Sequence, residues 1–119
     1  MAVTYTKELL SGSTNGKGIL VVATSTAGTL IHTAVAGTSS KDELTLFAVN
    51  STSTSKKLTI EWGEATAPVG NIEQTIAAES GLVLVVPGLL INNGLEVRAF
   101  CESANVVIIH GNAIRSVVA

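Results

Sequence analysis

The sequence predicts an all-β fold: a single antiparallel β-sandwich of about eight strands, jelly-roll-like, with an extended N-terminal arm. The first observation is composition, because Val, Ile and Thr make up nearly a third of the 119 residues. Branching at Cβ costs little in a pleated strand but restricts the side chain in a helix. The second is spacing, because short apolar stretches recur between Gly, Pro and Asn turn signals at intervals of roughly 8 to 12 residues. The length suits one domain with one core.

The expected strands share a short length, a high content of β-branched residues and flanking turn residues. They are residues 18–23, 29–35, 43–50, 56–62, 71–76, 81–86, 95–101 and 106–115. We expect 43–50 and 56–62 to pair as a hairpin across a polar tip at 51–55. We expect Pro87-Gly88 to end the strand 81–86, because proline cannot donate a ladder hydrogen bond.

Alternation within these strands predicts the core. In 56–62 the apolar side chains follow a strict period of two, so one face is buried and the other is polar. Runs such as 82–86 are apolar throughout and are expected to be covered on both faces. Six side chains are expected to lie between the two sheets: Leu58, Ile60, Trp62, Leu84, Val97 and Ile108.

The N-terminal residues have no clear core pattern. We divide the chain into an arm, residues 1–17, and a sandwich domain, residues 18–119. Within the arm, 4–10 could form one helical turn or an edge strand, and 11–18 is too rich in turn residues for regular structure. The arm is either a frayed end or a segment that lies on a neighbouring molecule. A phosphate-binding loop is excluded, because Lys17 is followed by Gly18 and not by Ser or Thr.

The charge is too low for an ordinary monomer surface. Charged residues make up 13% of the chain, against roughly 25% in typical soluble domains. We infer that part of the apolar surface contacts another chain and that the protein forms a homo-oligomer, with a trimer favoured. The net charge of -2 and the absence of a basic stripe argue against nucleic acid as a direct partner. No leader and no apolar run of about 20 residues is present, so we expect a soluble protein that makes no membrane contact.

No pattern of catalytic or ligand-binding residues is visible, so we expect no enzyme activity, no cofactor and no metal. His32 and His110 lie in apolar strands, where a lone histidine is more often a hydrogen-bonded core or interface residue than a base or ligand. Neither has the short Cys or His spacing of a zinc site. Cys101 is expected to be a small buried side chain, because it has no disulfide partner.

The residues from Glu43 to Arg115 carry a resemblance to a known family. The motifs are Leu44-Thr45-Leu46-Phe47-Ala48-Val49-Asn50, Leu58-Thr59-Ile60-Glu61-Trp62-Gly63, Ile76-Ala77-Ala78-Glu79-Ser80-Gly81-Leu82-Val83-Leu84-Val85-Val86-Pro87-Gly88 and Asn93-Gly94-Leu95-Glu96-Val97-Arg98-Ala99-Phe100. This succession of strand and turn residues resembles small virion proteins of tailed bacteriophages, most like a head decoration, or cement, protein. The first forty residues match this family less well.

The resemblance implies a β-sandwich that assembles as an oligomer on the phage particle and has no catalytic motif. The expected function is decoration and stabilisation of the capsid by bridging neighbouring major capsid proteins. The expected location is the capsid surface of the virion, after synthesis in the cytoplasm of a bacterial host. A tail or baseplate component is the alternative. A receptor or carbohydrate-binding module is a weaker one, because the chain has few aromatic residues for stacking on sugars.

Overall fold

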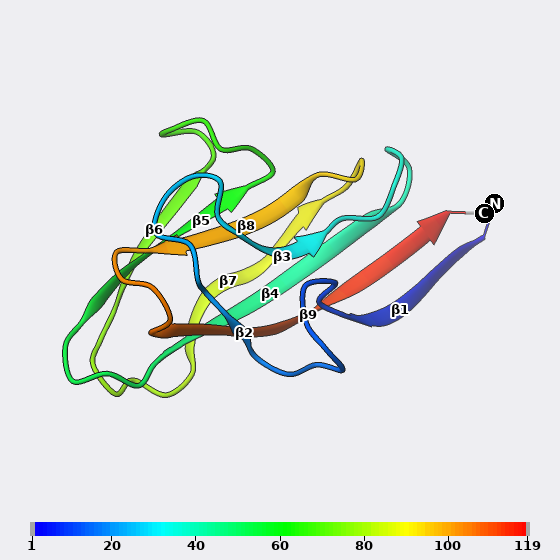
Figure 1. The fold of residues 1–119 in the computed structure, drawn as a ribbon. Coiled ribbons are helices and arrows are strands. Elements are labelled where there is room, and N and C mark those ends of the chain that lie inside the picture. Colours follow the sequence, from blue (N-terminus) through cyan, green and yellow to red (C-terminus); the bar gives the residue numbers. More distant parts are fainter. Residues whose placement is uncertain (1, 119) are drawn as a thin grey trace.

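The computed structural model describes residues 2–118, which form nine β-strands and no helix (Figure 1). No helix in this part of the chain could cross a membrane. In chain order the strands are β1 (Val3–Leu9), β2 (Ile19–Leu20), β3 (Thr29–Thr33), β4 (Lys41–Asn50), β5 (Lys56–Trp62), β6 (Asn71–Ile76), β7 (Val83–Ile91), β8 (Glu96–Cys101) and β9 (Val107–Val118).

The strands form two antiparallel sheets that pack face to face. The five-stranded sheet has the order β1-β9-β4-β7, and β2 also pairs with β9. The four-stranded sheet has the order β3-β8-β5-β6. From β2 onward, every connection except that from β5 to β6 carries the chain from one sheet to the other. This gives the strand order of a jelly roll. The all-β sandwich expected from the sequence is confirmed.

The expected hairpin between β4 and β5 is wrong. β4 pairs with β7 and β9, whereas β5 pairs with β6 and β8 in the other sheet. Residues 51–55 therefore carry the chain from one sheet to the other. The buried Asn50 fixes this corner: its Nδ2 donates to the carbonyl oxygens of Thr54, at 2.9 Å, and Ile76, at 3.1 Å. Its Oδ1 accepts from the backbone N–H of Thr52 at 3.0 Å.

The expected end of a strand at Pro87-Gly88 is also wrong. β7 continues through both residues to Ile91. It lies at the edge of the five-stranded sheet, where one side of the strand needs no hydrogen-bond partner, so proline is tolerated. The pairing with β4 absorbs the irregularity by two register shifts, between Leu44 and Thr45 and between Leu46 and Phe47.

The core lies between the two sheets, and the strands with clear alternation supply the side chains that were expected. Leu58, Ile60 and Val97 are buried, and Trp62 is partly buried against them. The assignment of Leu84 is wrong, because 49% of this residue is exposed. The assignment of Ile108 is also wrong, because it is only partly buried and its neighbours take the core positions. In β7 the buried residues are Val86 and Ile91, and in β9 they are Val107, Ile109 and Ala113.

The segment expected as an arm contains a regular edge strand. β1 pairs with β9 residue by residue, from Val3 opposite Val118 to Leu9 opposite Asn112. The next residue, Leu10, belongs to the core. The N–H of Gly12 then donates to the carbonyl of Ile31 at 2.9 Å, so residues 10–12 close against β3. β1 and the end of β9 extend away from the rest of the sandwich (Figure 1). Contact of residues 1–17 with a neighbouring molecule stays a prediction.

Candidate functional site

The outer face of the five-stranded sheet is rich in exposed apolar side chains. Opposite residues in paired antiparallel strands point to the same side of a sheet. Leu84 of β7 lies opposite Phe47 of β4, and Leu20 of β2 lies opposite Ile108 of β9. Strands β1, β2, β7 and β9 each place exposed large apolar residues on this face: Val3, Tyr5, Leu9, Leu20, Leu84, Leu90 and Ile114. We call this set, with Phe47 and Ile108, the apolar face.

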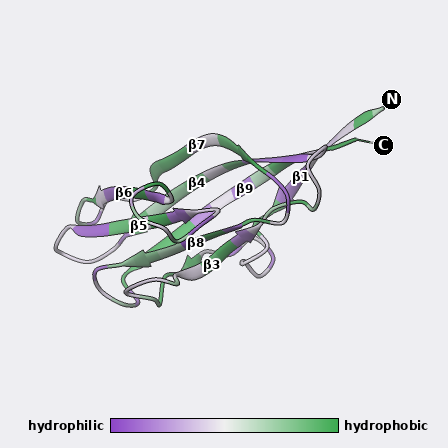
Figure 2. Cartoon of the chain, turned by 90° about the horizontal axis from the view of Figure 1, so that it is seen from above, coloured by the Kyte–Doolittle hydropathy of each residue, from purple (hydrophilic) through white to green (hydrophobic). Residues whose placement is uncertain are grey.

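The outer face of the four-stranded sheet is different, because it carries charged pairs. Lys57 and Glu73 approach to 3.2 Å between neighbouring strands β5 and β6. Arg98 and Glu96 approach to 2.9 Å on β8. Figure 2 shows β7, at the edge of the five-stranded sheet, mostly in the hydrophobic colour and β6 with hydrophilic stretches. The sandwich therefore has one outer face with charged pairs and one with many exposed apolar side chains.

A buried polar network joins β3, β4 and β9 inside this asymmetric sandwich. Asp42 is fully buried and accepts four hydrogen bonds. Nε2 of His32 donates to it at 2.8 Å and the N–H of Val35 at 3.1 Å. Arg115 adds two contacts, from Nε at 2.7 Å and from Nη2 at 3.0 Å. Glu8 of β1 lies 3.7 Å from the same guanidinium, so the network reaches the edge strand.

Two opposing effects set the pKa of Asp42. Burial raises the pKa of a carboxyl group, because it disfavours the charged form. The hydrogen bonds from Arg115 and then His32, together with the positive charge of Arg115, outweigh burial and hold the Asp42 pKa below its usual value. The same hydrogen bond raises the pKa of Arg115 against a smaller effect of burial. Asp42 is therefore a buried carboxylate whose charge is neutralised by its partners.

His32 takes a structural role in this network. Its Nδ1 accepts the backbone N–H of Ser11 at 3.0 Å, so the proton of a neutral ring sits on Nε2 and points at Asp42. Ser11, His32 and Asp42 lie together here. The Ser11 hydroxyl accepts the N–H of Thr33 at 2.6 Å, and it is the backbone N–H of Ser11, not this hydroxyl, that binds the imidazole. With both ring nitrogens hydrogen-bonded, His32 fixes the loop after β1 to the sandwich. The expectation of a satisfied core histidine is met.

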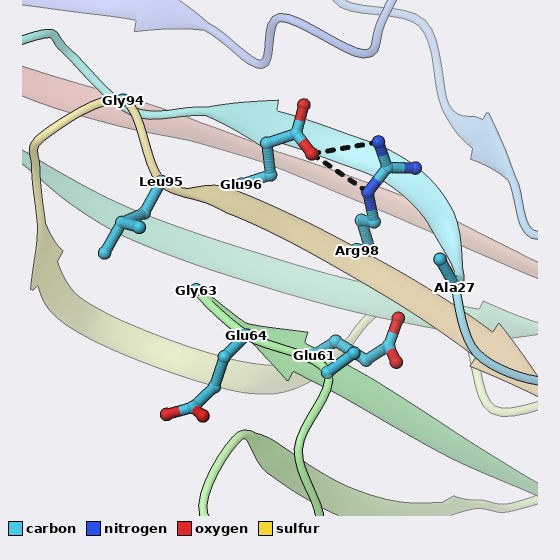
Figure 3. Close-up of a pocket in the computed structure, with 9 residues that line it drawn as sticks. Ala27, Glu61, Gly63, Glu64, Gly94, Leu95, Glu96 and Arg98 are labelled. Atoms are coloured by element: carbon cyan, nitrogen blue, oxygen red, sulfur yellow. Dashed lines mark hydrogen bonds and ion pairs between the residues drawn. The ribbon is translucent and has the colours of Figure 1, made fainter.

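A second polar cluster lines a cavity of about 370 Å³ beside the charged outer face (Figure 3). Glu61 is 2% exposed and accepts hydrogen bonds from Thr26 Oγ1 at 2.6 Å and from the N–H of Gly28 at 2.7 Å. Arg98 donates to the carbonyl of Gly28 at 3.0 Å. Figure 3 shows the Glu61 and Glu64 side chains pointing in opposite directions. Glu61 of β5 and Arg98 of β8 thus both bind residues 26–28 and hold this segment against the four-stranded sheet.

The other residues singled out in the sequence lie apart. His110 is on the outer side of β9, opposite Phe47, and Gly18 packs directly over its ring, since a Cβ there would lie 2.8 Å from His110 Cε1. Cys101 is a free, buried core residue. Among residues 2–118, no three His, Cys, Asp or Glu side chains are grouped so that they could hold a metal. The expectation of no catalytic, cofactor or metal residues stays a prediction.

Comparison with known protein families, with curated proteins and with solved structures found no match to this chain.

Sequence reasoning missed the two features that distinguish this molecule. Asp42 and Arg115 are 73 residues apart, and nothing in the sequence pairs them. The apolar face was missed at Leu84, because an unbroken apolar run gives no indication of which alternate side chains face outward. The one usable signal was the low overall charge, which indicated an apolar contact surface without placing it.

Proposed function

We propose that this chain is a structural virion protein that decorates a bacteriophage capsid and bridges neighbouring major capsid proteins, with the apolar face as its contact surface. The observation that carries the proposal is the asymmetry between the two outer faces of the sandwich. Exposed apolar patches beyond a few hundred Å² mark interaction surfaces on soluble domains. The apolar face spans strands β1, β2, β9, β4 and β7, and three exposed charged residues, Lys7, Lys41 and Glu43, lie on the same side of the sheet.

The mechanical demands of such a role support the proposal. A capsid filled with DNA is under outward pressure, and a bridging protein resists it through buried contact area rather than through a reactive site. Two buried carboxylates tie loops to strands, Asp42 between the sheets and Glu61 on the covered outer side of β5, and we expect these ties to stiffen the sandwich. A stiff body with one apolar outer face can transmit load between two neighbouring subunits.

The resemblance to small phage virion proteins is consistent with this reading, because its motifs cover β4 to β8 and the stretch ends in β9. Within this stretch, β4, β7 and β9 supply five of the nine residues of the apolar face, and the other four lie in β1 and β2. The capsid surface is the proposed location, and major capsid protein is the proposed partner. Threefold symmetry of the assembly stays a prediction from the sequence, and it competes with the two-fold pairing proposed below.

Binding to empty capsids of the phage whose genome encodes the chain tests the proposal. We expect the purified protein to cosediment with the capsids and Leu84→Asp to weaken binding at least tenfold, because it places a charge in the apolar face. Thr75→Asp is the matched control, since it adds the same charge on the exposed outer side of edge strand β6. Equal binding by both variants would overturn the assigned face, and binding to isolated tails instead of capsids would favour a tail component.

A further inference from the structure

β1 is an exposed edge strand that lacks the proline, register shifts and covering loop found at β7 and β3; of the other edges, β6 is also free of proline and register shifts but is one residue shorter. Exposed strand edges carry unpaired N–H and C=O groups, which proteins shield with proline, bulges, charged side chains or covering loops. Of these devices β1 has only the charged pair Lys7 and Glu8 near its end. β7 contains Pro87 and two register shifts, and β3 is covered by the hydrogen bond from Gly12 to Ile31. β1 has seven residues, no Pro or Gly, and an unbroken register with β9.

β1 is also exposed on both faces. Every residue of the strand except Glu8 is exposed, and Tyr5 reaches 72%. At its start, Val3 and Thr4 pair with β9 beyond the point where β4 begins at Lys41, opposite Ser116. The tip is thus a ribbon of two strands, which is marginally stable in water, and a third strand would stabilise it.

We propose that the free edge of β1 pairs antiparallel with β1 of a second copy of this chain, about a two-fold axis normal to the sheet. This axis is the one that brings two identical edges together, since it reverses the strand direction and keeps each face on its own side. Residues opposite each other must then point to the same side. They are therefore both odd-numbered or both even-numbered.

One register satisfies this condition over the whole strand. If the two-fold axis passes between the two copies of Lys7 or of Glu8, like charges lie opposite each other, which is destabilising. If it passes between the two copies of Tyr5, only residues 3–7 pair. If the axis passes between the two copies of Thr6, all seven residues pair and no like charges lie opposite each other. Val3 then faces Leu9 of the second copy, Thr4 faces Glu8, Tyr5 faces Lys7, and Thr6 faces Thr6.

This pairing gives the proposed function a geometric basis. The two five-stranded sheets become one continuous sheet, and both apolar faces lie on the same side of it. Such a dimer can lie flat on a surface and contact two neighbouring subunits at once. The bridging consequence rests on the proposed capsid function, whereas the pairing itself is a property of the free protein.

A cysteine pair tests the register. In the proposed dimer the two copies of residue 6 have Cα atoms about 4.5 to 5.5 Å apart, which is within the range for a disulfide. Residue 4 is the matched control, because its two copies are roughly 13 Å apart along the strands. We expect Thr6→Cys to form a disulfide-linked dimer under mild oxidation and Thr4→Cys to stay unlinked. Cys101 is buried and does not compete. Equal cross-linking of the two variants, or none in either, would overturn the pairing.

The mass of the full chain in solution, by sedimentation equilibrium without capsids, provides the second test. We expect a dimer, and a monomer or a trimer would overturn the pairing. Thr6→Lys should raise the dimer Kd about fivefold, because two lysines then oppose each other. Thr4→Lys, which faces Glu8, should not raise it. Far-UV circular dichroism checks that both variants fold.

A dimer that fails to bind capsids would refute the proposed function alone, and a monomer that binds them would refute the pairing alone.

Discussion

Replacing Asp42 by alanine should be among the most damaging single changes in this protein. The carboxylate is fully buried and accepts hydrogen bonds from His32, Val35 and twice from Arg115. Its loss leaves His32 buried without a partner for Nε2–H. It also leaves Arg115, whose side chain is 26% exposed, with the more distant Glu8.

The expected cost follows from this geometry. Removing one member of a buried ion pair costs about 3 to 5 kcal/mol, because the remaining partners lose their compensation. Arg115 can recover some hydration at its exposed part, so we expect the lower half of this range. A domain of this size has a free energy of unfolding of roughly 6 to 18 kcal/mol. With an m value of about 2 kcal/mol/M, the urea midpoint should fall by roughly 1.5 to 2 M.

The assay is urea unfolding followed by Trp62 fluorescence at one protein concentration. Glu43→Ala is the matched control, because it removes a carboxylate from the next residue of β4, where the side chain is exposed. The control should shift the free energy of unfolding by no more than about 0.5 kcal/mol. If Asp42→Ala shifts the midpoint no more than Glu43→Ala does, the buried network does not stabilise the fold as we argue.

Three further predictions concern pH, the core and metals. Because its partners hold the folded-state pKa of Asp42 below its usual value, its stabilisation is complete above the unfolded pKa of about 3.9 and is lost as the pH falls through the folded-state pKa. The urea midpoint of the wild type should therefore fall more steeply below pH 4 than that of Asp42→Ala, and parallel curves would contradict this. Ile60→Ala should cost about 2 to 5 kcal/mol of unfolding free energy through lost burial and a cavity, against less than half of that for the exposed Leu84→Ala; equal losses would refute the strand register. Elemental analysis should find no stoichiometric zinc, and its presence would overturn our reading of His32 and His110.

The sequence predicted strands well where polar and apolar residues alternate. The bounds of β5 and β6 agree with those expected, because strict alternation and flanking turn residues define both ends. Alternation indicates which face of a strand is buried but not which strand lies beside it. For this reason, the prediction paired β4 with β5, whereas the chain crosses between sheets after Asn50.

The remaining failures have a common physical cause, since they depend on contacts between distant residues. In β7 and β9, consecutive apolar residues allow either set of alternate side chains to face inward, and packing against β4 decides. The edge position of β7 lets Pro87 stay within a strand. Burial of His32 and Asp42 depends on Arg115, which lies far away in the sequence. None of these contacts has a local pattern.

Electron microscopy of phage particles that carry the protein tests the central claim most directly. At a resolution that separates the two sheets, we expect density for the sandwich on the capsid surface between neighbouring major capsid proteins. The strands β9, β4 and β7 should face the capsid, and the charged pairs of β5, β6 and β8 should face solvent. Density on the tail, or a sandwich bound to the capsid through its four-stranded sheet, would contradict the account.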